Sequence, residues 1–343
     1  MQFNFNIAGI GAVSPAGQGL EHLLDGSVRC LKNWPTLAPS TPLVAAGCVD
    51  LALPCWARWR THPRLRRAGA QTLFLIEAVD EAIRRANLPS GATIGLSVAF
   101  GNGVLTLTRK FYEGVVRAGL DGANPAWFPE TVFNAPLNHA LGALGRAGPS
   151  SAWVGDATAF AQAWVNAGLW LEQGNVDAVV VAAAEEVDEA MMEVSLRAGW
   201  FRPASKVFPA EGAVAFALTR EGPAQTQGSL QIHSGLPWGS RLAAPAALAE
   251  VLADFAPAWP VCAGPMPPPG PARRAWQQRP PREEWSAPWP YLGEAHSVSA
   301  GWTLARILTS APNEKFAFVL PLWGEGHEVA ALGWESLQHC VAR

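Results

Sequence analysis

The stretch from Gly148 to Glu186, GPSSAWVGDATAFAQAWVNAGLWLEQGNVDAVVVAAAEE, has the pattern of a strand, a sharp turn, a helix and a second strand. A Gly-Pro turn leads into the short apolar run Ala152-Trp153-Val154, and Asp156 is placed to cap a helix that begins near Ala157. The helix has apolar residues at i, i+3 and i+4 spacing and stops at a glycine. Asp177 to Ala184 is a continuous apolar run, which is typical of a strand buried on both faces of a layered sheet.

The residues before this stretch alternate between strand and helix patterns. We expect an apolar-polar strand from Phe3 to Ile10, a strong helix from Leu65 to Asn87 and a further strand from Thr93 to Phe100. A turn at Gly101-Asn102-Gly103 then leads into another helix. Residues 28–64 are rich in proline and lack periodicity, so we expect an irregular connection there. The order strand, helix, strand, helix predicts an α/β layered fold.

The composition excludes several classes of protein. The net charge is −3 over 343 residues, and no run of Lys and Arg forms a nucleic-acid-binding stripe. No basic leader precedes Arg29, and no window approaches the roughly 18 apolar residues of a membrane span, so we expect neither a signal peptide nor a span. The five cysteines match no zinc or CxxC spacing, which predicts reduced thiols in a cytoplasmic protein: Cys30, Cys48, Cys55, Cys262 and Cys340.

The turn before Ala157 is a place where many enzymes hold a nucleophile, because the helix dipole and free amides favour an anion there. Residues 148–186 resemble the nucleophile segment of the β-ketoacyl synthases, which reads roughly G-P-x-x-x-[VI]-x-T-A-C-[AST]-[SA]-[GA]. By this resemblance, Ala157 stands at the position of the nucleophilic cysteine. A methyl group cannot be a nucleophile, so the resemblance implies both a family and the loss of its central residue.

Three further segments resemble the same family in the same order along the chain. Gly9 to Gly17 is similar to the family's G-x-G-x-[VI]-[ST]-P-x-G, and Phe128 to Asn134 is similar to F-x-P-x-x-x-x-N. Glu211 and Gly212 match part of G-E-G-[AG]-G. The first segment does not complete the three-glycine pattern of a dinucleotide-binding loop, so we expect no phosphate site there.

The resemblance implies a dimer interface. In the family, the segment matching 128–134 lies at that interface and helps to line the partner's acyl tunnel, which implies such a role for Phe133 and Asn134. The residues alone allow another interpretation, in which Phe133 is ordinary core and Asn134 caps a helix. The strand Ala152-Trp153-Val154 would pair with its counterpart in the partner. We expect His139, in the small helix nearby, to have a packing role.

The β-ketoacyl synthases also use two histidines and a lysine. The segment of the first histidine is matched by residues 260–266, which place Gly264 at the histidine position. The segment of the second is matched by residues 291–301, where His296 is kept and Tyr291 replaces the lysine. A lone histidine on an apolar background also fits a hydrogen-bonded core residue.

Other catalytic or metal sites find little support in the sequence. Thr158 or Ser151 would need a nearby base, and no Ser/His/Asp arrangement has a recognisable spacing. A run of acidic residues after the apolar strand fits either a cation site or the structural glutamates that the family has here: Glu185, Glu186, Asp188 and Glu189. We expect no cofactor and no metal.

The resemblance implies the thiolase-like fold, an α/β architecture of two similar halves stacked into five layers, α-β-α-β-α. The N-terminal half would comprise residues 1–227 and contain the vestigial nucleophile turn. The C-terminal half, residues 228–343, is short for the family and includes a Pro-rich loop at 265–290.

A chain that keeps this scaffold without the nucleophile resembles the chain length factors of type II polyketide systems, and its compact length resembles the ketosynthase-like partners of aryl polyene pathways. The resemblance implies a pseudoenzyme that forms a heterodimer with an active β-ketoacyl synthase, shapes its acyl tunnel and works with an acyl carrier protein. Two alternatives are a malonyl-carrier-protein decarboxylase and a homodimeric protein that binds an acyl group in the vestigial tunnel. The sixteen tryptophans fit either a large core or an apolar partner surface.

Overall fold

The computed structural model describes residues 1–25, 30–34, 44–197, 208–220, 226–237, 259–260, 292–310, 317–323 and 328–336. Among these residues the strands are β1 (Gln2–Ser14), β2 (Gly17–Gln18), β3 (Leu31–Trp34), β4 (Val44–Gly47), β5 (Ile94–Phe100), β6 (Ser150–Val154), β7 (Ala178–Glu185), β8 (Gly212–Thr219), β9 (Thr226–Pro237), β10 (Trp259–Pro260), β11 (Ala317–Trp323) and β12 (Glu328–Ser336). The α-helices are α1 (Leu20–Asp25), α2 (Ala57–Arg60), α3 (Ala70–Arg85), α4 (Leu105–Ala118), α5 (Ala135–Ala143), α6 (Thr158–Glu172), α7 (Glu189–Arg197) and α11 (Ser297–Ser310). Short 3-10 turns are η1 (Pro54–Trp56), η2 (Pro63–Leu65), η3 (Gly119–Gly122) and η4 (Phe128–Thr131).

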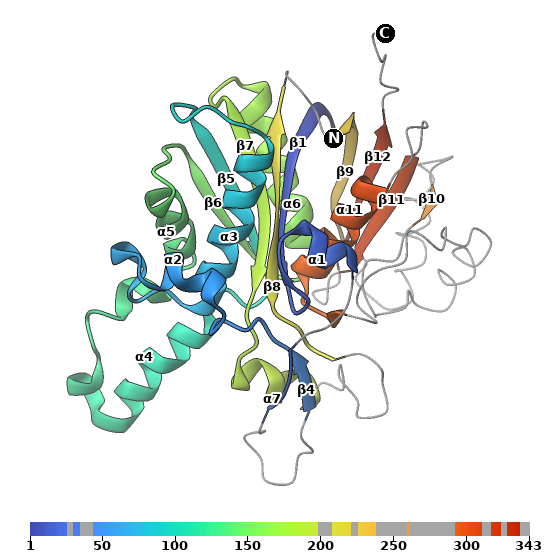
Figure 1. Cartoon of the computed structure of the whole chain (residues 1–343). Coiled ribbons are helices and arrows are strands. Elements are labelled where there is room, and N and C mark those ends of the chain that lie inside the picture. The colour runs from blue at the N-terminus through green and yellow to red at the C-terminus, as the bar shows by residue number, and fades with distance from the viewer. Residues whose placement is uncertain are drawn as a thin grey trace.

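One curled sheet runs through the described part of the chain (Figure 1). Its strand order is β10-β11-β12-β9-β1-β8-β7-β5-β6, and β2 pairs with the end of β1. Strand β1 joins the two parts of the sheet, because its residues 6–13 pair with β8 and its residues 2–7 pair with β9. Strands β5, β6 and β7 are parallel, so their carboxyl ends meet at one edge of the sheet.

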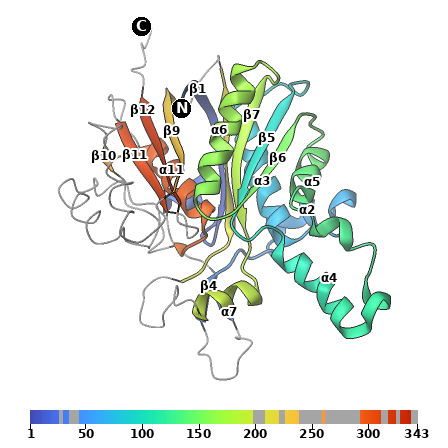
Figure 2. The same cartoon turned by 180° about the vertical axis from the view of Figure 1, so that it is seen from behind.

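Helices α6 and α11 lie inside the curl of the sheet (Figure 2). Helix α6 contacts β5, β6 and β7 on one side and β9, β11 and β12 on the other, while α11 contacts β7, β8 and β11. Helix α3 contacts β1, β7 and β8 and packs against α5. The described residues thus form four layers, α-β-α-β, of the five that the resemblance implies.

Strand β7 shows why the apolar run at 178–184 is so long. All eight of its residues are buried. Val179, Val181 and Ala183 belong to the core around α6 and α11, and the alternate residues Val180 and Ala182 belong to the core around α3. Because successive side chains point to opposite faces of a strand, both faces of β7 must be apolar. The prediction of a doubly buried strand is confirmed.

Aromatic side chains tie α6 to both parts of the sheet. Phe5 of β1 stacks on Trp164 of α6 with ring centroids 5.8 Å apart, and its ring lies 6.3 Å from Trp334 of β12. Phe216 of β8 lies 5.3 Å from Trp164. Trp164 and Trp302 are fully buried, so core filling accounts for these two tryptophans.

Two glycines of the opening segment serve the packing of β1 on α3. A Cβ at Gly9 would lie 2.2 Å from the carbonyl oxygen of Ala82, and one at Gly11 would lie 2.1 Å from that of Ala78. Only glycine allows the backbone of α3 to approach the strand this closely. The two glycines have a structural role here, in keeping with the prediction of no phosphate loop.

Some expected elements differ from the observed ones. The expected helix at 65–87 is replaced by the turn η2 and the shorter α3, which is followed by Asn87 in a left-handed conformation (φ 52°) ahead of Pro89. The expectation of an irregular connection at 28–64 is wrong in part, because the hairpin of β3 and β4 and the helix α2 form there. Hairpin pairing joins residues distant in sequence, which local periodicity does not register.

The predicted division of the chain at residues 227 and 228 stays a prediction. The Pro-rich loop expected at 265–290 lies outside the described residues. None of the helices formed by the described residues is long and apolar enough to cross a bilayer.

Candidate functional site

The turn before Ala157, which resembles the nucleophile turn of the β-ketoacyl synthases, lies where the carboxyl ends of β5, β6 and β7 meet the start of α6. Ala157 is the cap residue of α6, with right-handed helical angles (φ −57°, ψ −21°). Its methyl group packs against the core around α6 and α11. The position that resembles the family's cysteine is therefore held at a helix N-terminus but carries no reactive atom.

Asp156 takes up the hydrogen-bond donors at the start of this helix. Its Oδ1 accepts from the backbone N–H of Thr158 at 2.9 Å and from the hydroxyl of Thr158 at 2.6 Å. The capping role predicted for Asp156 is confirmed, although α6 begins at Thr158. Because a carboxylate already occupies the positive end of the helix, a second anion at position 157 would be disfavoured.

His296 lies beside this turn at the start of α11. Its backbone is left-handed (φ 47°), a conformation that costs a non-glycine residue about 1 kcal/mol or more. Desolvation by the surrounding protein lowers the pKa of His296 to about 4, and the charge of Asp156 opposes this shift. The hydroxyl of Ser297 donates to the carbonyl oxygen of Asp156 at 3.4 Å, which connects α11 to the turn. The retained histidine is therefore neutral near pH 7.

Glu185 closes the site from the end of β7. Its carboxylate accepts from the backbone N–H of Gly101 and, at 3.4 Å each, from the backbone and side-chain amides of Asn102. Burial raises the pKa of Glu185 to about 8, against the lowering effect of these hydrogen bonds. The carboxyl group holds the turn after β5 in place, a role that sequence reasoning left open between structure and cation binding.

The neighbouring carboxylates also bind backbone amides. Glu211 accepts from Val49 N–H at 2.8 Å and from Val187 N–H at 3.1 Å, and burial raises its pKa to about 7. Glu186 accepts from the backbone N–H of Gln71 at 3.2 Å. Within the described ranges, no group of three or more His, Cys, Asp or Glu side chains is arranged to hold a metal ion. These contacts favour the structural interpretation of the acidic run.

Gly101 leaves room for both His296 and Glu185. A Cβ at Gly101 would lie 2.9 Å from Glu185 Oε1 and 2.9 Å from the Cβ of His296. We therefore expect Gly101→Ala to lower the free energy of unfolding by about 1–3 kcal/mol in urea titrations. The matched control is Gly155→Ala in the next turn, where the nearest atom to the new methyl is 3.8 Å away. Equal stabilities for the two variants would contradict this packing.

The 128–134 segment belongs to an exposed projection, which we call the arm and define as residues 105–134 (Figures 1 and 2). The interpretation of Phe133 as ordinary core is wrong, because its side chain is half exposed and its ring lies over Gly103. Asn134 is at the cap position of α5, yet its side chain makes no capping hydrogen bond. Other large apolar side chains of the arm are also exposed: Tyr112, Val116, Leu120, Phe128 and Val132.

His139 of α5 does more than pack. Its Nε2 lies 2.7 Å from Oε2 of Glu130, which is mostly buried at the base of the arm. This contact joins the arm to α5. It could not be predicted from the sequence, because the two residues belong to different elements.

Strand β6 forms an open edge of the sheet within the described structure, since it ends the strand order and pairs with β5 alone. The indole N–H of Trp153 donates to Ser97 Oγ at 3.2 Å, which fixes the ring against β5. Ala152 is partly buried and Val154 is exposed. The three residues expected at an interface thus lie on a strand with an unpaired edge, which is a template for strand pairing.

Of the four positions matched to the family's catalytic residues by resemblance, the structure brings together Ala157 and His296. Gly264 and Tyr291 lie outside the described residues. Sequence reasoning missed the proximity of Asp156 to His296 and of Glu185 to Gly101, because these pairs come from distant segments. The one signal in the sequence was the acidic Asp156 directly before Ala157.

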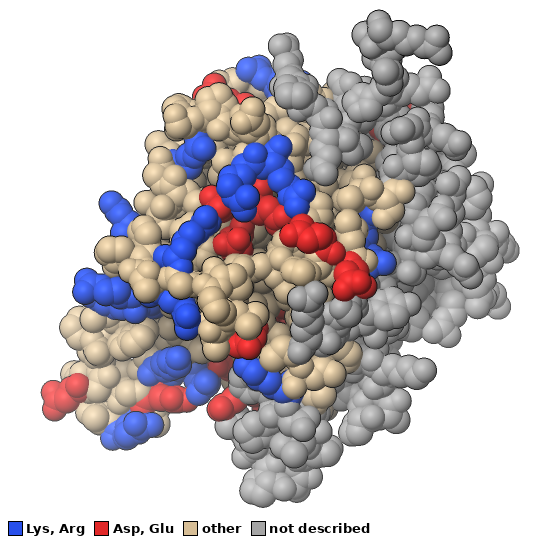
Figure 3. All heavy atoms as spheres, viewed as in Figure 1, with Lys and Arg blue, Asp and Glu red and all other residues tan. Residues whose placement is uncertain are grey.

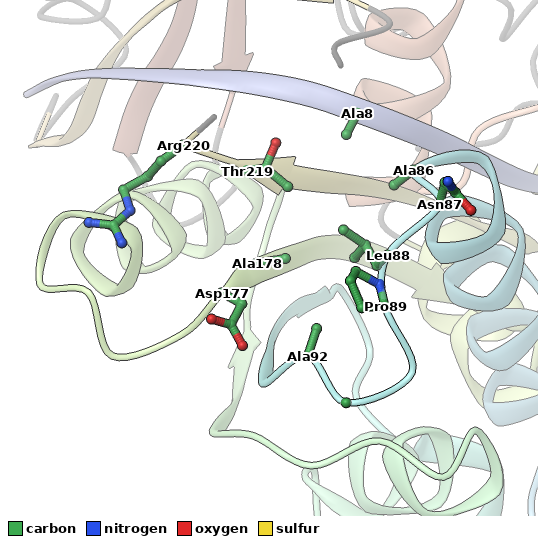
Figure 4. Close-up of a pocket in the computed structure, with 11 residues that line it drawn as sticks. Ala8, Ala86, Asn87, Leu88, Pro89, Ala92, Asp177, Ala178, Thr219 and Arg220 are labelled. Carbon is green, nitrogen blue, oxygen red and sulfur yellow. The ribbon is translucent and has the colours of Figure 1, made fainter. Parts of the chain in front are cut away.

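A separate hollow of about 830 Å³ opens at the other end of these strands, where β7 begins (Figure 4). It is lined by the end of α3, the start of β7 and the end of β8. Figure 4 shows Asp177 and Arg220 on one side of it and Asn87 on the other, so these polar groups do not converge on one point. Asp177 also accepts from the backbone N–H of Thr93 at 2.8 Å. The hollow is therefore distinct from the site at Ala157.

Comparisons with known proteins agree with this geometry at the level of the fold. No family model and no curated protein sequence matches the chain. Among solved structures, the ishigamide ketosynthase/chain length factor has a TM-score of 0.74 at 16% identity and is covered over 99% of its length by 97% of this chain. A type II polyketide synthase acyl carrier protein in complex with its ketosynthase gives 0.72 at 16% identity, with 98% of this chain and 100% of that chain covered. An oxazolomycin ketosynthase domain of Streptomyces albus gives 0.71 at 15% identity, covering 98% of this chain and 75% of that one. The predicted fold is confirmed: the chain has the α/β thiolase-like fold of the ketosynthases.

Proposed function

We propose that this chain is a non-catalytic ketosynthase-like subunit, a chain length factor. It forms a heterodimer with an active β-ketoacyl synthase and shapes the acyl tunnel while polyketide or aryl polyene chains are extended on a carrier protein. The observation that carries this proposal is Ala157 at the start of α6, where the side chain offers no nucleophile and the Asp156 carboxylate accepts from the first amide of the helix.

Two surfaces of the chain support the proposal that it pairs with a partner subunit in a dimer. Strand β6 has an unpaired edge, and the arm exposes apolar side chains, among them Phe133 at half exposure. Helix α4 has one buried residue, Leu107, in its fourteen, so it gains little stability from packing within the described structure. One similar structure is a ketosynthase/chain length factor and another is a ketosynthase with its carrier protein.

Co-expression with the ketosynthase encoded beside this chain tests the proposal. We expect the two chains to co-purify in a one-to-one complex through size exclusion. A stable, self-sufficient homodimer that leaves the ketosynthase behind would contradict the heterodimer.

Restoring the cysteine is not expected to restore catalysis. The variant Ala157→Cys would place a thiol beside the carboxylate of Asp156, which raises the pKa of a thiol and disfavours the reactive thiolate. We expect no acylation at position 157 when the variant is incubated with an acyl-loaded carrier protein and read by peptide mass spectrometry. The parent chain controls for the other cysteines. Stoichiometric acylation at position 157 would show that the site is still competent.

A malonyl-carrier-protein decarboxylase is the second candidate, favoured by the neutral His296 held next to the Ala157 turn. Measuring carbon dioxide release from malonyl-carrier protein, with the parent chain and with His296→Ala, separates the two functions. Release that depends on His296 would favour the decarboxylase, and release at the level of the blank would favour the non-catalytic subunit.

A further inference from the structure

Cys30 and Cys48 lie opposite each other at the end of the hairpin where β3 begins and β4 ends. The register of the hairpin pairs Leu31 with Gly47, so Cys30 and Cys48 form the next pair along the same two strands. The backbone N–H of Cys48 donates to the carbonyl oxygen of Cys30 at 2.9 Å, which extends the ladder to this pair. The two cysteines are distant in the sequence but are cross-strand neighbours in the fold.

Both side chains belong to the face of the hairpin that packs on α7. Directly opposite residues of an antiparallel pair project from the same face of the strands. Cys48 is 2% exposed in a small apolar cluster with Met191 and Met192 of α7, and Cys30 packs against that cluster. Figures 1 and 2 show β4 and α7 side by side from both directions. The two thiols therefore share one apolar layer between the hairpin and the helix.

The spacing of this pair suits a disulfide bond. Two hydrogen-bonded residues of an antiparallel pair have their Cα atoms about 5.5 Å apart. Disulfides usually join residues whose Cα atoms are about 4.4–6.8 Å apart. The thiol of Cys48 donates to the carbonyl oxygen of Ala46 at 3.7 Å. Because a thiol is a weak donor, turning this sulfur toward Cys30 gives up little, and the backbone already holds the two residues within bonding range.

The two thiols differ in their access to solvent. Cys48 is buried, whereas Cys30 is partly exposed and is followed by Leu31, which is 57% exposed. A small disulfide in solution can therefore reach Cys30 first. Figure 3 shows basic and acidic side chains interspersed on the face of the molecule seen in Figure 1. No field of one sign on that face would keep a charged reagent away.

We propose that Cys30 and Cys48 form a reversible disulfide, made by exchange with a low-molecular-weight disulfide, and that this bond locks β3 to β4. The Cys30 thiol loses its proton to solvent, and its sulfur attacks one sulfur of the small disulfide and displaces the other half as a thiolate. The Cys48 thiol then loses its proton, and its sulfur attacks Cys30 Sγ and displaces the second small thiolate. The two released thiolates take up two protons, so the protein is oxidised by two electrons and the small disulfide is reduced to two thiols. A reducing thiol reverses both steps.

The lock would act beside the segments that lead to His296. The backbone N–H of Gly47 donates to the carbonyl oxygen of Pro209 at 2.8 Å, and that of Glu211 donates to Gly47 O at 3.0 Å. A Cβ at Gly47 would lie 2.9 Å from the carbonyl oxygen of Leu292, four residues before His296. Because a disulfide reduces the entropy that is gained when the linked strands separate, the bridged hairpin opens less often. Oxidation would therefore stiffen the backbone on which the His296 segment packs.

This modification goes beyond the proposed function and does not depend on it, so it is tested on the purified full chain. The chain is incubated with excess oxidised glutathione, the remaining thiols are alkylated with N-ethylmaleimide, and linked peptides are identified by non-reducing mass spectrometry. We expect most of the chain to carry Cys30 linked to Cys48, and dithiothreitol to return both thiols. Cys48→Ala should stop at a mixed disulfide of Cys30 with glutathione. In Cys30→Ala, the buried Cys48 should stay reduced.

The matched control is Cys55→Ala, which removes an exposed cysteine of η1 and should leave the linkage unchanged. Incubation of the parent chain in urea controls for the fold, since the pairs should there be spread over all five cysteines. Cys30 linked mainly to another cysteine in the folded chain would overturn the proposal. Alkylation of both Cys30 and Cys48 after the incubation would overturn it as well.

Hydrogen exchange measures the lock. The backbone N–H of Val49 donates to Oε1 of Glu211 at 2.8 Å, so it reports the contact between the hairpin and the residues before β8. In the linked chain, we expect the amide protons of Gly47 and Val49 to exchange at least about tenfold more slowly than in the reduced chain. Cys48→Ala should show no such change on oxidation. Equal exchange rates in the linked and reduced parent chain would show that the bond forms without locking the hairpin, against the proposal.

Discussion

Replacing Ala152 with proline is expected to abolish co-purification with the ketosynthase while leaving the chain folded. The backbone N–H of Leu96 donates to Pro149 O at 2.9 Å, and that of Gly155 donates to Phe100 O at 3.0 Å. Because amides alternate along a strand, the amide of Ala152 points away from β5, toward the open edge. Proline there removes one donor and places its ring where a paired strand would lie.

The expected loss is at least about tenfold in recovered complex, since one missing hydrogen bond and the steric block together exceed 1.4 kcal/mol. Ala152→Ser keeps the amide and serves as the control. Circular dichroism of the two variants checks that both remain folded. Undiminished recovery of the ketosynthase with the proline variant would mean that the partner binds elsewhere, with the exposed arm as the remaining surface.

The element pattern from 148 to 186 was predictable because it is local. The periodicity of α6, its cap at Asp156 and the doubly apolar β7 all depend on residues close in sequence, and the structure confirms them. The double pairing of β1 with β8 and β9 was not predictable, because it joins segments more than 200 residues apart. The same limit applies to the hairpin at 31–47, whose strands carry no periodicity of their own.

The candidate site was predictable in its positions but not in its contacts. The resemblance placed Ala157 and His296, and the structure brings them to the same turn. Asp156 accepts from the first amide of α6, and Phe133 is exposed above Gly103. Both contacts follow only from three-dimensional packing.

The buried carboxyl of Glu185 is expected to make the protein less stable as the pH rises from about 5 to 8. Its pKa is about 8 in the folded state, where burial disfavours the charge, against an ordinary value of 4.5 for an exposed glutamate. Below the lower value the group is protonated in both states, so the folded state carries no penalty. Above it the unfolded chain loses the proton first, and the free energy of unfolding falls until the pH passes the folded pKa. The difference between the two values corresponds to about 5 kcal/mol at most.

The variant Glu185→Gln cannot ionise, and its side-chain oxygen can still accept from the backbone N–H of Gly101. In urea titrations at pH 5, 6.5 and 8 we expect the variant to match the parent chain at the lowest pH and to exceed its stability by several kcal/mol at the highest. Glu172→Gln, at the exposed end of α6, removes the same charge and should change stability by less than about 0.5 kcal/mol throughout. If Glu185→Gln follows the parent chain at every pH, the carboxyl has the same pKa in the folded and unfolded states, which contradicts a shift caused by burial. A stabilised variant at pH 8 would instead show that Glu185 is held as a neutral acid in the folded state.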